Sequence, residues 1–116
     1  MKIVKYEQAQ ELKNSNTSKL LEYSIELNDK DIDFCINTID GRYPEKGYCT
    51  NEECKEICYI LEGNGTINKQ KETIAFKQGD VILIEKEEIY YWNGNCKIIM
   101  ICTPAWYKEQ CKLLDL

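Results

Sequence analysis

Short runs of β-favouring residues alternate along the chain with residues that favour turns. The runs cover residues 2–6, 19–27, 31–39, 56–61, 66–68, 72–76, 80–84, 89–92 and 96–102. The turn formers between them are Asn28-Asp29, Asp40-Gly41, Gly63-Asn64-Gly65, Gly79-Asp80 and Asn93-Gly94-Asn95. Gly, Asn and Asp accept the positive φ of tight reversals. Many short strands at even spacing predict an all-β sandwich or barrel, with one short helical turn within residues 7–13.

The composition limits the possible classes of protein. A chain of 116 residues with 43% hydrophobic residues can bury the core of one domain, which we expect to span residues 1–116. No stretch approaches the roughly 20 apolar residues of a membrane helix, so a membrane partner is not expected. The formal net charge is −5 and no basic cluster is present, so we expect no nucleic acid partner either.

Seven cysteines raise the question of a disulfide framework. The first residues, MKIVKYEQAQ, contain no apolar run of the kind found in secretion signals, so we expect a cytoplasmic protein with reduced thiols. Cys54 and Cys58 are separated by three residues, whereas a thioredoxin-type motif has two.

Two segments resemble the sequence blocks of the cupin family. Glu56-Ile-Cys-Tyr-Ile-Leu-Glu-Gly63 resembles the second half of the first block, and Gly79-Asp80-Val-Ile-Leu-Ile84 resembles the start of the second. The similarity extends over about residues 41–103. It implies a double-stranded β-helix, a jelly-roll-like barrel, in which Glu56 points inward. It does not by itself imply an activity.

The resemblance implies a metal site that this chain lacks the histidines to build, since it contains no histidine. The first block's two histidine positions fall on Cys49 and Asn51, or on Thr50 and Glu52, and Tyr90 stands at the histidine of the second block. We therefore predict no metal and no cofactor. The alternative is an atypical metal site that uses Cys49, Glu52 and Glu56.

Alternation along the strands sorts the side chains into two faces. If Glu56 points inward, Cys58 and Ile60 do too, while Ile57, Tyr59 and Leu61 point outward. Both faces are then apolar, and the outer one needs a cover. Either the N-terminal strands or a second subunit could supply it, and we expect a homodimer.

The same alternation predicts an aromatic, sulfur-rich pocket. Its expected ligand-binding residues are Arg42, Asn51, Glu56, Tyr90, Trp92 and Met100. We interpret the protein as a module that binds a small, partly flat molecule. Two alternatives stay open: an isomerase- or epimerase-like enzyme with Glu56 and Tyr90 as catalytic candidates, and an interaction subunit whose barrel is filled by side chains such as Trp92.

Overall fold

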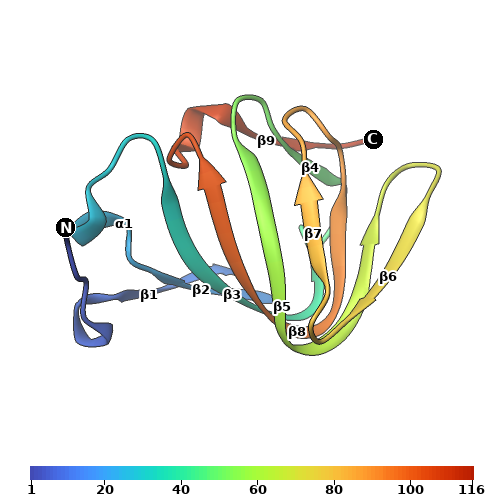
Figure 1. The fold of residues 1–116 in the computed structure, drawn as a ribbon. Helices are drawn as coiled ribbons and strands as arrows, with labels where there is room; N and C mark the ends of the chain where they lie inside the picture. The colour runs from blue at the N-terminus through green and yellow to red at the C-terminus, as the bar shows by residue number, and fades with distance from the viewer.

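The computed structural model describes residues 1–116, most of them in strands (Figure 1). The elements in chain order are η1 (Tyr6–Gln8), β1 (Gln10–Ser15), β2 (Ser18–Glu22), α1 (Ser24–Leu27), β3 (Asp33–Tyr43), β4 (Tyr48–Asn51), β5 (Lys55–Asn68), β6 (Thr73–Lys77), β7 (Val81–Ile84), β8 (Tyr91–Thr103), η2 (Lys108–Gln110) and β9 (Cys111–Leu114). The large sheet has the strand order β1-β2-β3-β8-β5-β6, with β7 paired to β5. This confirms the predicted all-β barrel with a short N-terminal helical turn, although the turn lies at Tyr6–Gln8 and residues 10–13, predicted as part of it, belong to β1.

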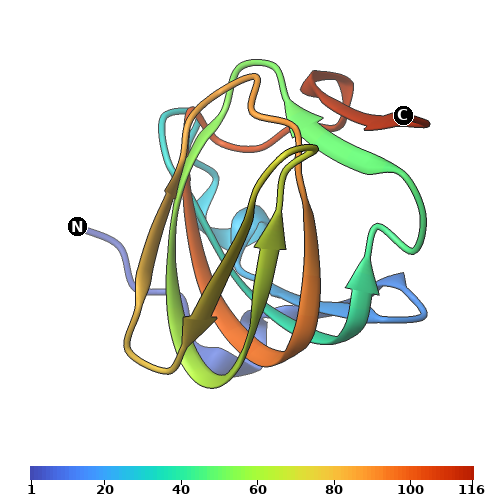
Figure 2. The same ribbon diagram turned by 90° about the vertical axis from the view of Figure 1, so that its right-hand side faces the viewer.

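The large sheet closes into a barrel because its two longest strands, β5 and β8, curve together (Figures 1 and 2). They pair antiparallel, with one register shift between Ile60 and Glu62. Gly65 lies opposite Gly94, and a Cβ on Gly94 would stand 2.6 Å from the carbonyl oxygen of Asn64. Only the absence of a side chain permits so close an approach of two backbones.

Several predicted elements are wrong, and the curvature of β5 and β8 explains two of them. The segments 63–65 and 93–95, predicted as turns, lie inside β5 and β8, because their glycines allow the two paired backbones to approach closely rather than reverse the chain. Residues 2–5 form no strand and lead into η1, and β1 already begins at Gln10. The predicted strand at 19–27 ends at Glu22 and is followed by the single turn of α1.

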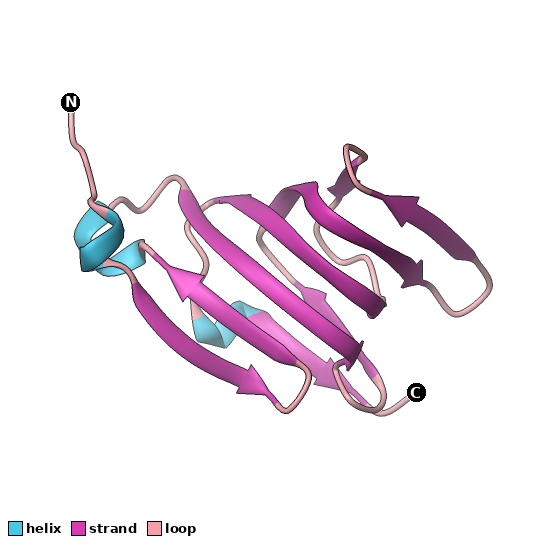
Figure 3. Cartoon of the chain, turned by 90° about the horizontal axis from the view of Figure 1, so that it is seen from below, coloured by secondary structure: helices cyan, strands magenta, loops and turns pink.

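A small second sheet, β4 with β9, joins the C-terminal segment to the barrel. The backbone of Cys49 in β4 exchanges two hydrogen bonds with Tyr90, of 2.9 and 3.1 Å, which ties this sheet to the start of β8. Figure 3 shows the strands of the large sheet side by side from below. The core inside the barrel consists of Ile39, Cys49, Cys58, Ile60, Ile67, Phe76, Ile84, Tyr90, Trp92, Cys96 and Ile98.

Side chains that point away from the barrel form a continuous apolar surface across neighbouring strands, which we call the outer face. Its members in register are Leu21 on β2, Ile36 on β3, Ile99 and Ile101 on β8, Ile57 and Tyr59 on β5, and Val81 and Leu83 on β7. The four on β5 and β7 are between 42% and 58% exposed. Strands β1 and β2 extend the sheet at its edge and do not cover this face. That a second copy of the chain covers the outer face stays a prediction.

We expect Leu83→Glu to convert a homodimer into a monomer, because an interface would bury the new carboxylate without a partner. Sedimentation velocity of the wild type and the variant measures the change. Leu113→Glu is the control, since Leu113 is equally apolar and 67% exposed but lies on β9, away from the outer face. A wild type that sediments as a monomer at every concentration contradicts the prediction.

The structure contains no helix with the length and apolar character that a membrane crossing requires.

Candidate functional site

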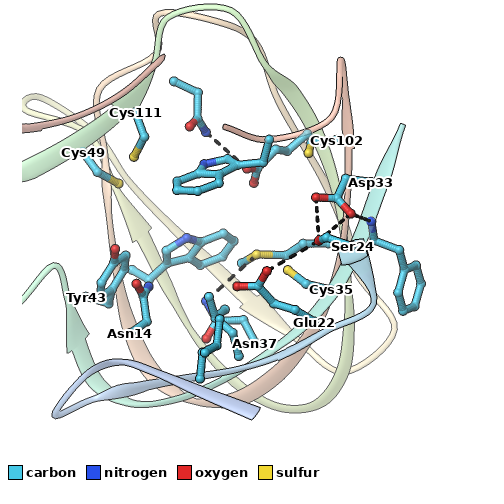
Figure 4. A pocket seen from close by; sticks show the side chains of 18 of the residues that line it. Asn14, Glu22, Ser24, Asp33, Cys35, Asn37, Tyr43, Cys49, Cys102 and Cys111 are labelled. Carbon is cyan, nitrogen blue, oxygen red and sulfur yellow. Dashed lines mark hydrogen bonds between the residues drawn. The ribbon is translucent and has the colours of Figure 1, made fainter. Parts of the chain in front are cut away.

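A cavity of about 400 Å³ occupies the interior of the barrel (Figure 4). Twelve of its 20 lining residues are hydrophobic, so its walls are mostly apolar, as in sites for small molecules. The aromatic lining residues are Phe34, Tyr43, Tyr90, Trp92 and Trp106. The polar and charged ones are Lys13, Asn14, Glu22, Ser24, Asp33, Asn37, Asn51 and Glu56.

Five of the six residues predicted to bind a ligand line this one cavity. They are Asn51, Glu56, Tyr90, Trp92 and Met100. Strands β4, β5 and β8 and the segment before β8 supply them, so residues far apart in the sequence meet because the barrel closes. Cys49 lines the cavity with Asn51, whereas Thr50 and Glu52 do not. The structure thus selects the first of the two registers that the sequence left open.

Our prediction that Arg42 lines the pocket is wrong. Its guanidinium donates hydrogen bonds of 2.9 Å to the carbonyl oxygens of Pro44 and Gly47, and it stacks 3.7 Å from the centre of the Tyr91 ring. These contacts hold the loop between β3 and β4 and satisfy the charge outside the cavity. Arg42 is not among the lining residues.

Glu56 is the most deeply buried carboxyl group in the cavity wall, with 8% of the residue exposed. It faces inward from β5, where it lies opposite Cys102 of β8 and Ile84 of β7. Its Oε1 accepts a hydrogen bond of 3.2 Å from Nδ2 of Asn51. Burial raises the pKa of Glu56 from 4.5 to about 7, against the opposing effect of the Asn51 bond. The side chain can therefore exchange a proton near neutral pH.

The groups around Glu56 are thiols and phenols rather than cations. Burial raises the pKa of Cys49 to about 12 and that of Cys58 well above its usual range, and the charge of Glu56 adds to both effects. The pKa values of Cys35 and Cys102 are raised by the same two causes. These thiols stay protonated at neutral pH and behave as small apolar side chains.

Tyr90 and Trp92 bring two polar groups to the wall of the cavity. The Tyr90 hydroxyl donates a hydrogen bond to the sulfur of Cys49, and the residue is only 5% exposed. The indole N–H of Trp92, a residue 2% exposed, is unpaired. Thr50 Oγ1 is the only fully buried polar side-chain atom without a partner, so the Trp92 N–H, on a residue of the cavity wall, keeps some exposure.

Trp92 also belongs to the core. Its ring packs edge-on against Phe76 and Tyr90, with centroids 5.6 and 6.1 Å away. The two roles that the sequence left open, core filling and pocket wall, are therefore combined in one side chain. The barrel is not filled completely, because the cavity lies next to this aromatic group.

Sequence reasoning missed an acidic side of the cavity. The Ser24 hydroxyl bonds to both carboxylate oxygens of Asp33, at 2.8 and 2.9 Å, and to Glu22 at 3.5 Å. Figure 4 shows these three side chains together, on the side opposite Cys49 and Cys111. Burial and the nearby Asp33 raise the pKa of Glu22. The signal was available, because Glu22 interrupts an apolar run with a polar residue at an inward position.

The residues at the family's usual ligand positions do not fit a transition metal. The structure brings no three Cys, Asp, Glu or His side chains together in a metal-holding group. At the positions of the imidazoles stand a protonated thiol, an amide and a phenol, in Cys49, Asn51 and Tyr90, none of which is a good ligand in that state. Glu52 of the alternative site is exposed and its carboxylate lies 4.0 Å from Lys112 Nζ. That no metal is bound stays a prediction.

A curved antiparallel barrel with one inner cavity and a carboxyl group on its wall defines a small cupin. The profile of the EutQ-like cupin domain family matches residues 44–105, and the chain belongs to this family. The match includes Asn51, Glu56, Tyr90 and Trp92. The resemblance noted in the sequence is therefore confirmed.

Solved structures show the same fold at low sequence identity. A variant of Pac13 from Streptomyces with uridine aligns with a TM-score of 0.85 and 15% identity, over 100% of this chain and 93% of that one. The polyketide cyclase RemF from Streptomyces resistomycificus gives 0.76 and 13%, over 100% and 87%. An RmlC-like cupin from Shewanella frigidimarina gives 0.68 and 16%, over 88% and 89%. No curated protein matches the sequence.

The raised pKa of Glu56 predicts that the protein loses stability as the pH rises. The folded state holds this proton more tightly than the unfolded state, so the stabilisation is complete below about pH 4.5 and is lost as the pH passes 7. The loss is on the order of 3 kcal/mol in the free energy of unfolding. Urea unfolding between pH 4.5 and 7.5 measures it, and Glu56→Gln should abolish this part of the slope.

Glu62→Gln is the matched control, because Glu62 lies exposed on the same strand. It should keep the slope of the wild type. Equal slopes in the wild type and Glu56→Gln would show that Glu56 has an ordinary pKa in the folded protein.

Proposed function

We propose that this protein binds a small, partly flat molecule that is neutral or cationic inside its barrel. The observation that carries the proposal is a mostly apolar cavity of about 400 Å³ whose wall holds the Trp92 indole, with no partner for its N–H, and the buried Glu56. Unpaired polar groups in an apolar wall cost free energy that a ligand with matching acceptors recovers. The aromatic rings offer faces for a flat group to stack on.

The charge of the wall supports this class of ligand. Glu22, Asp33 and Glu56 line the cavity against a single cation, Lys13. Such a wall disfavours phosphates and carboxylates, whereas hydroxyl and amino groups can donate to the carboxylates. Uridine, present in the Pac13 structures, has this chemistry, since it is neutral and carries a flat base and several hydroxyl groups. A nucleoside is accordingly the first ligand to test.

Neutral nucleosides and small aromatic amines should raise the melting temperature of the protein, and the corresponding nucleoside monophosphates should not. Thermal shift followed by calorimetric titration measures both effects. Trp92→Phe should weaken the binding about tenfold, because it keeps the ring packing but removes the N–H donor.

Tyr107→Phe is the control for that variant, because Tyr107 is an aromatic residue outside the cavity. Trp92→Ala is less informative, since truncation of this buried ring should cost about 3–5 kcal/mol of stability. If neutral compounds and phosphates bind equally well, or none of them binds, the proposed ligand class is wrong.

Proton transfer by Glu56 supports a second candidate, an acid–base enzyme. A group with a pKa of about 7 can take a proton from a substrate carbon or hydroxyl and return it at another position. Tyr90, whose pKa burial raises well above its usual range, stays protonated and would donate a hydrogen bond to the charge that develops. Pac13 is described as a nucleoside dehydratase and RemF as a polyketide cyclase. Enzymes therefore occur on this fold.

Glu56→Gln distinguishes the two candidates. It keeps the shape and the hydrogen bonds of the side chain but removes the titrating proton. A binding module should keep its affinity within a fewfold. An enzyme should lose at least about a hundredfold in kcat with any ligand that the wild type converts, and the wild-type rate should depend on a group that titrates near pH 7. Ligand conversion is followed by mass spectrometry.

A further inference from the structure

Gln110 is a polar side chain buried without an assigned role. It lies at the end of η2, beyond the residues that match the cupin family, and it is 2% exposed. Burying an amide this deeply is costly unless both its oxygen and its nitrogen are hydrogen-bonded. Its partners therefore indicate what the residue does.

Both ends of the Gln110 amide are fixed by their partners. Its Oε1 accepts hydrogen bonds from the backbone N–H groups of Glu53, at 3.2 Å, and Cys54, at 3.1 Å. A backbone N–H can only donate, so the oxygen must face this loop and the nitrogen must face the other way. The nitrogen, Nε2, donates a hydrogen bond of 2.8 Å to Oδ1 of Asn51.

The orientation of Gln110 in turn fixes that of Asn51. Because the Asn51 oxygen faces Gln110, its Nδ2 faces Glu56 and donates the 3.2 Å bond to Oε1. A rotated Asn51 would present its oxygen to the carboxyl group instead. An oxygen favours the protonated form of a carboxyl group, whereas an N–H favours the ionised form.

We propose that Gln110 is a positioning residue, which holds the Asn51 amide as a donor to Glu56 and thereby sets the protonation of the cavity's inner carboxyl group. The C-terminal segment thus controls a group on β5 through one side chain on β4. The inference concerns the ligand-free protein and does not depend on the function proposed above.

The other groups near Glu56 cannot replace this donor. The titratable groups whose pKa values the charge of Glu56 raises are the thiols of Cys35 on β3, Cys49 on β4, Cys58 on β5, Cys102 on β8, Cys111 on β9 and Cys54, and the phenols of Tyr43 and Tyr90. All have raised pKa values, and the set includes no lysine or arginine. The Cys58 thiol lies 4.0 Å from Oε2 of Glu56, a weak contact. The Asn51 amide is the one group that favours the ionised form.

The titration of Glu56 itself tests the proposal. Carbon-13 NMR of the side-chain carboxyl groups follows it in the full chain, with the signal assigned by its loss in Glu56→Gln. Asn51→Ala and Gln110→Ala should each increase the proton affinity of Glu56 about tenfold, because each removes the oriented donor. Gln78→Ala, a change at an exposed glutamine, should leave it unchanged.

A double-mutant cycle separates positioning from a merely structural role. If Gln110 acts through Asn51, the double variant Asn51→Ala/Gln110→Ala titrates like Asn51→Ala alone. Additive effects, or no effect of Gln110→Ala on the titration, would overturn the proposal.

Gln110→Glu covers the case in which Gln110→Ala does not fold. A carboxylate still accepts from the two backbone N–H groups, so the C-terminal segment keeps its anchor. The negative charge added by Gln110→Glu should raise the proton affinity of Glu56 whether or not Asn51 is present. A change in the orientation of the amide at position 51 can add to this effect only when Asn51 is present. The proton affinity of Glu56 should therefore rise more in the wild-type background than in Asn51→Ala. An equal rise in both backgrounds would overturn the proposal.

Discussion

The pairing of β5 with β8 is the interaction on which the rest of the structure depends. These strands pair antiparallel along their length while they curve around the barrel, and the close pairing of Gly65 with Gly94 permits the curvature. One end of the pair places Glu56 opposite Cys102, and the other places Trp92 opposite Ile67. One continuous ladder thus positions both Glu56 and Trp92 in the cavity wall. A side chain on either glycine would separate the two backbones and displace both ends of the site.

The second constraint is the burial of a carboxyl group without a cation. A buried charge is usually paired, yet the only lysine in the cavity wall is Lys13 on β1, and it makes no ion pair with Glu56. Burial instead raises the pKa of Glu56, and the carboxyl group receives one hydrogen bond from the Asn51 amide, which Gln110 orients. This arrangement leaves Glu56 divided between its two protonation states near neutral pH. A nearby arginine would have fixed it as a carboxylate.

Much of the barrel and of its inner wall could be predicted from the sequence. Alternation within single strands placed Glu56, Trp92 and Met100 inward, because a period of two is a local property. The glycine segments at 63–65 and 93–95 were wrongly predicted as turns, since a glycine that allows two paired strands to approach closely looks the same in sequence as one that makes a turn. Arg42 was wrongly placed in the pocket because its guanidinium donates to the carbonyl oxygen of Pro44. Every residue has a backbone carbonyl, so the sequence does not indicate which one a side chain will bind. Gln110 could not be found locally, since its partners are about 60 residues away.

The substitution of thiols and neutral polar groups for imidazoles changes what pH can do inside this barrel. Imidazoles would titrate in the same pH range as Glu56 and interact with it. The pKa values of such a site would then belong to the coupled groups together and not to any one residue. Here the surrounding thiols and phenols titrate far above neutrality because burial penalises their charged forms. Glu56 is therefore the group at the inner end of the cavity that changes charge near pH 7. Any ligand there meets either a hydrogen-bond donor or a negative charge, and the balance is set by one amide from the C-terminal segment.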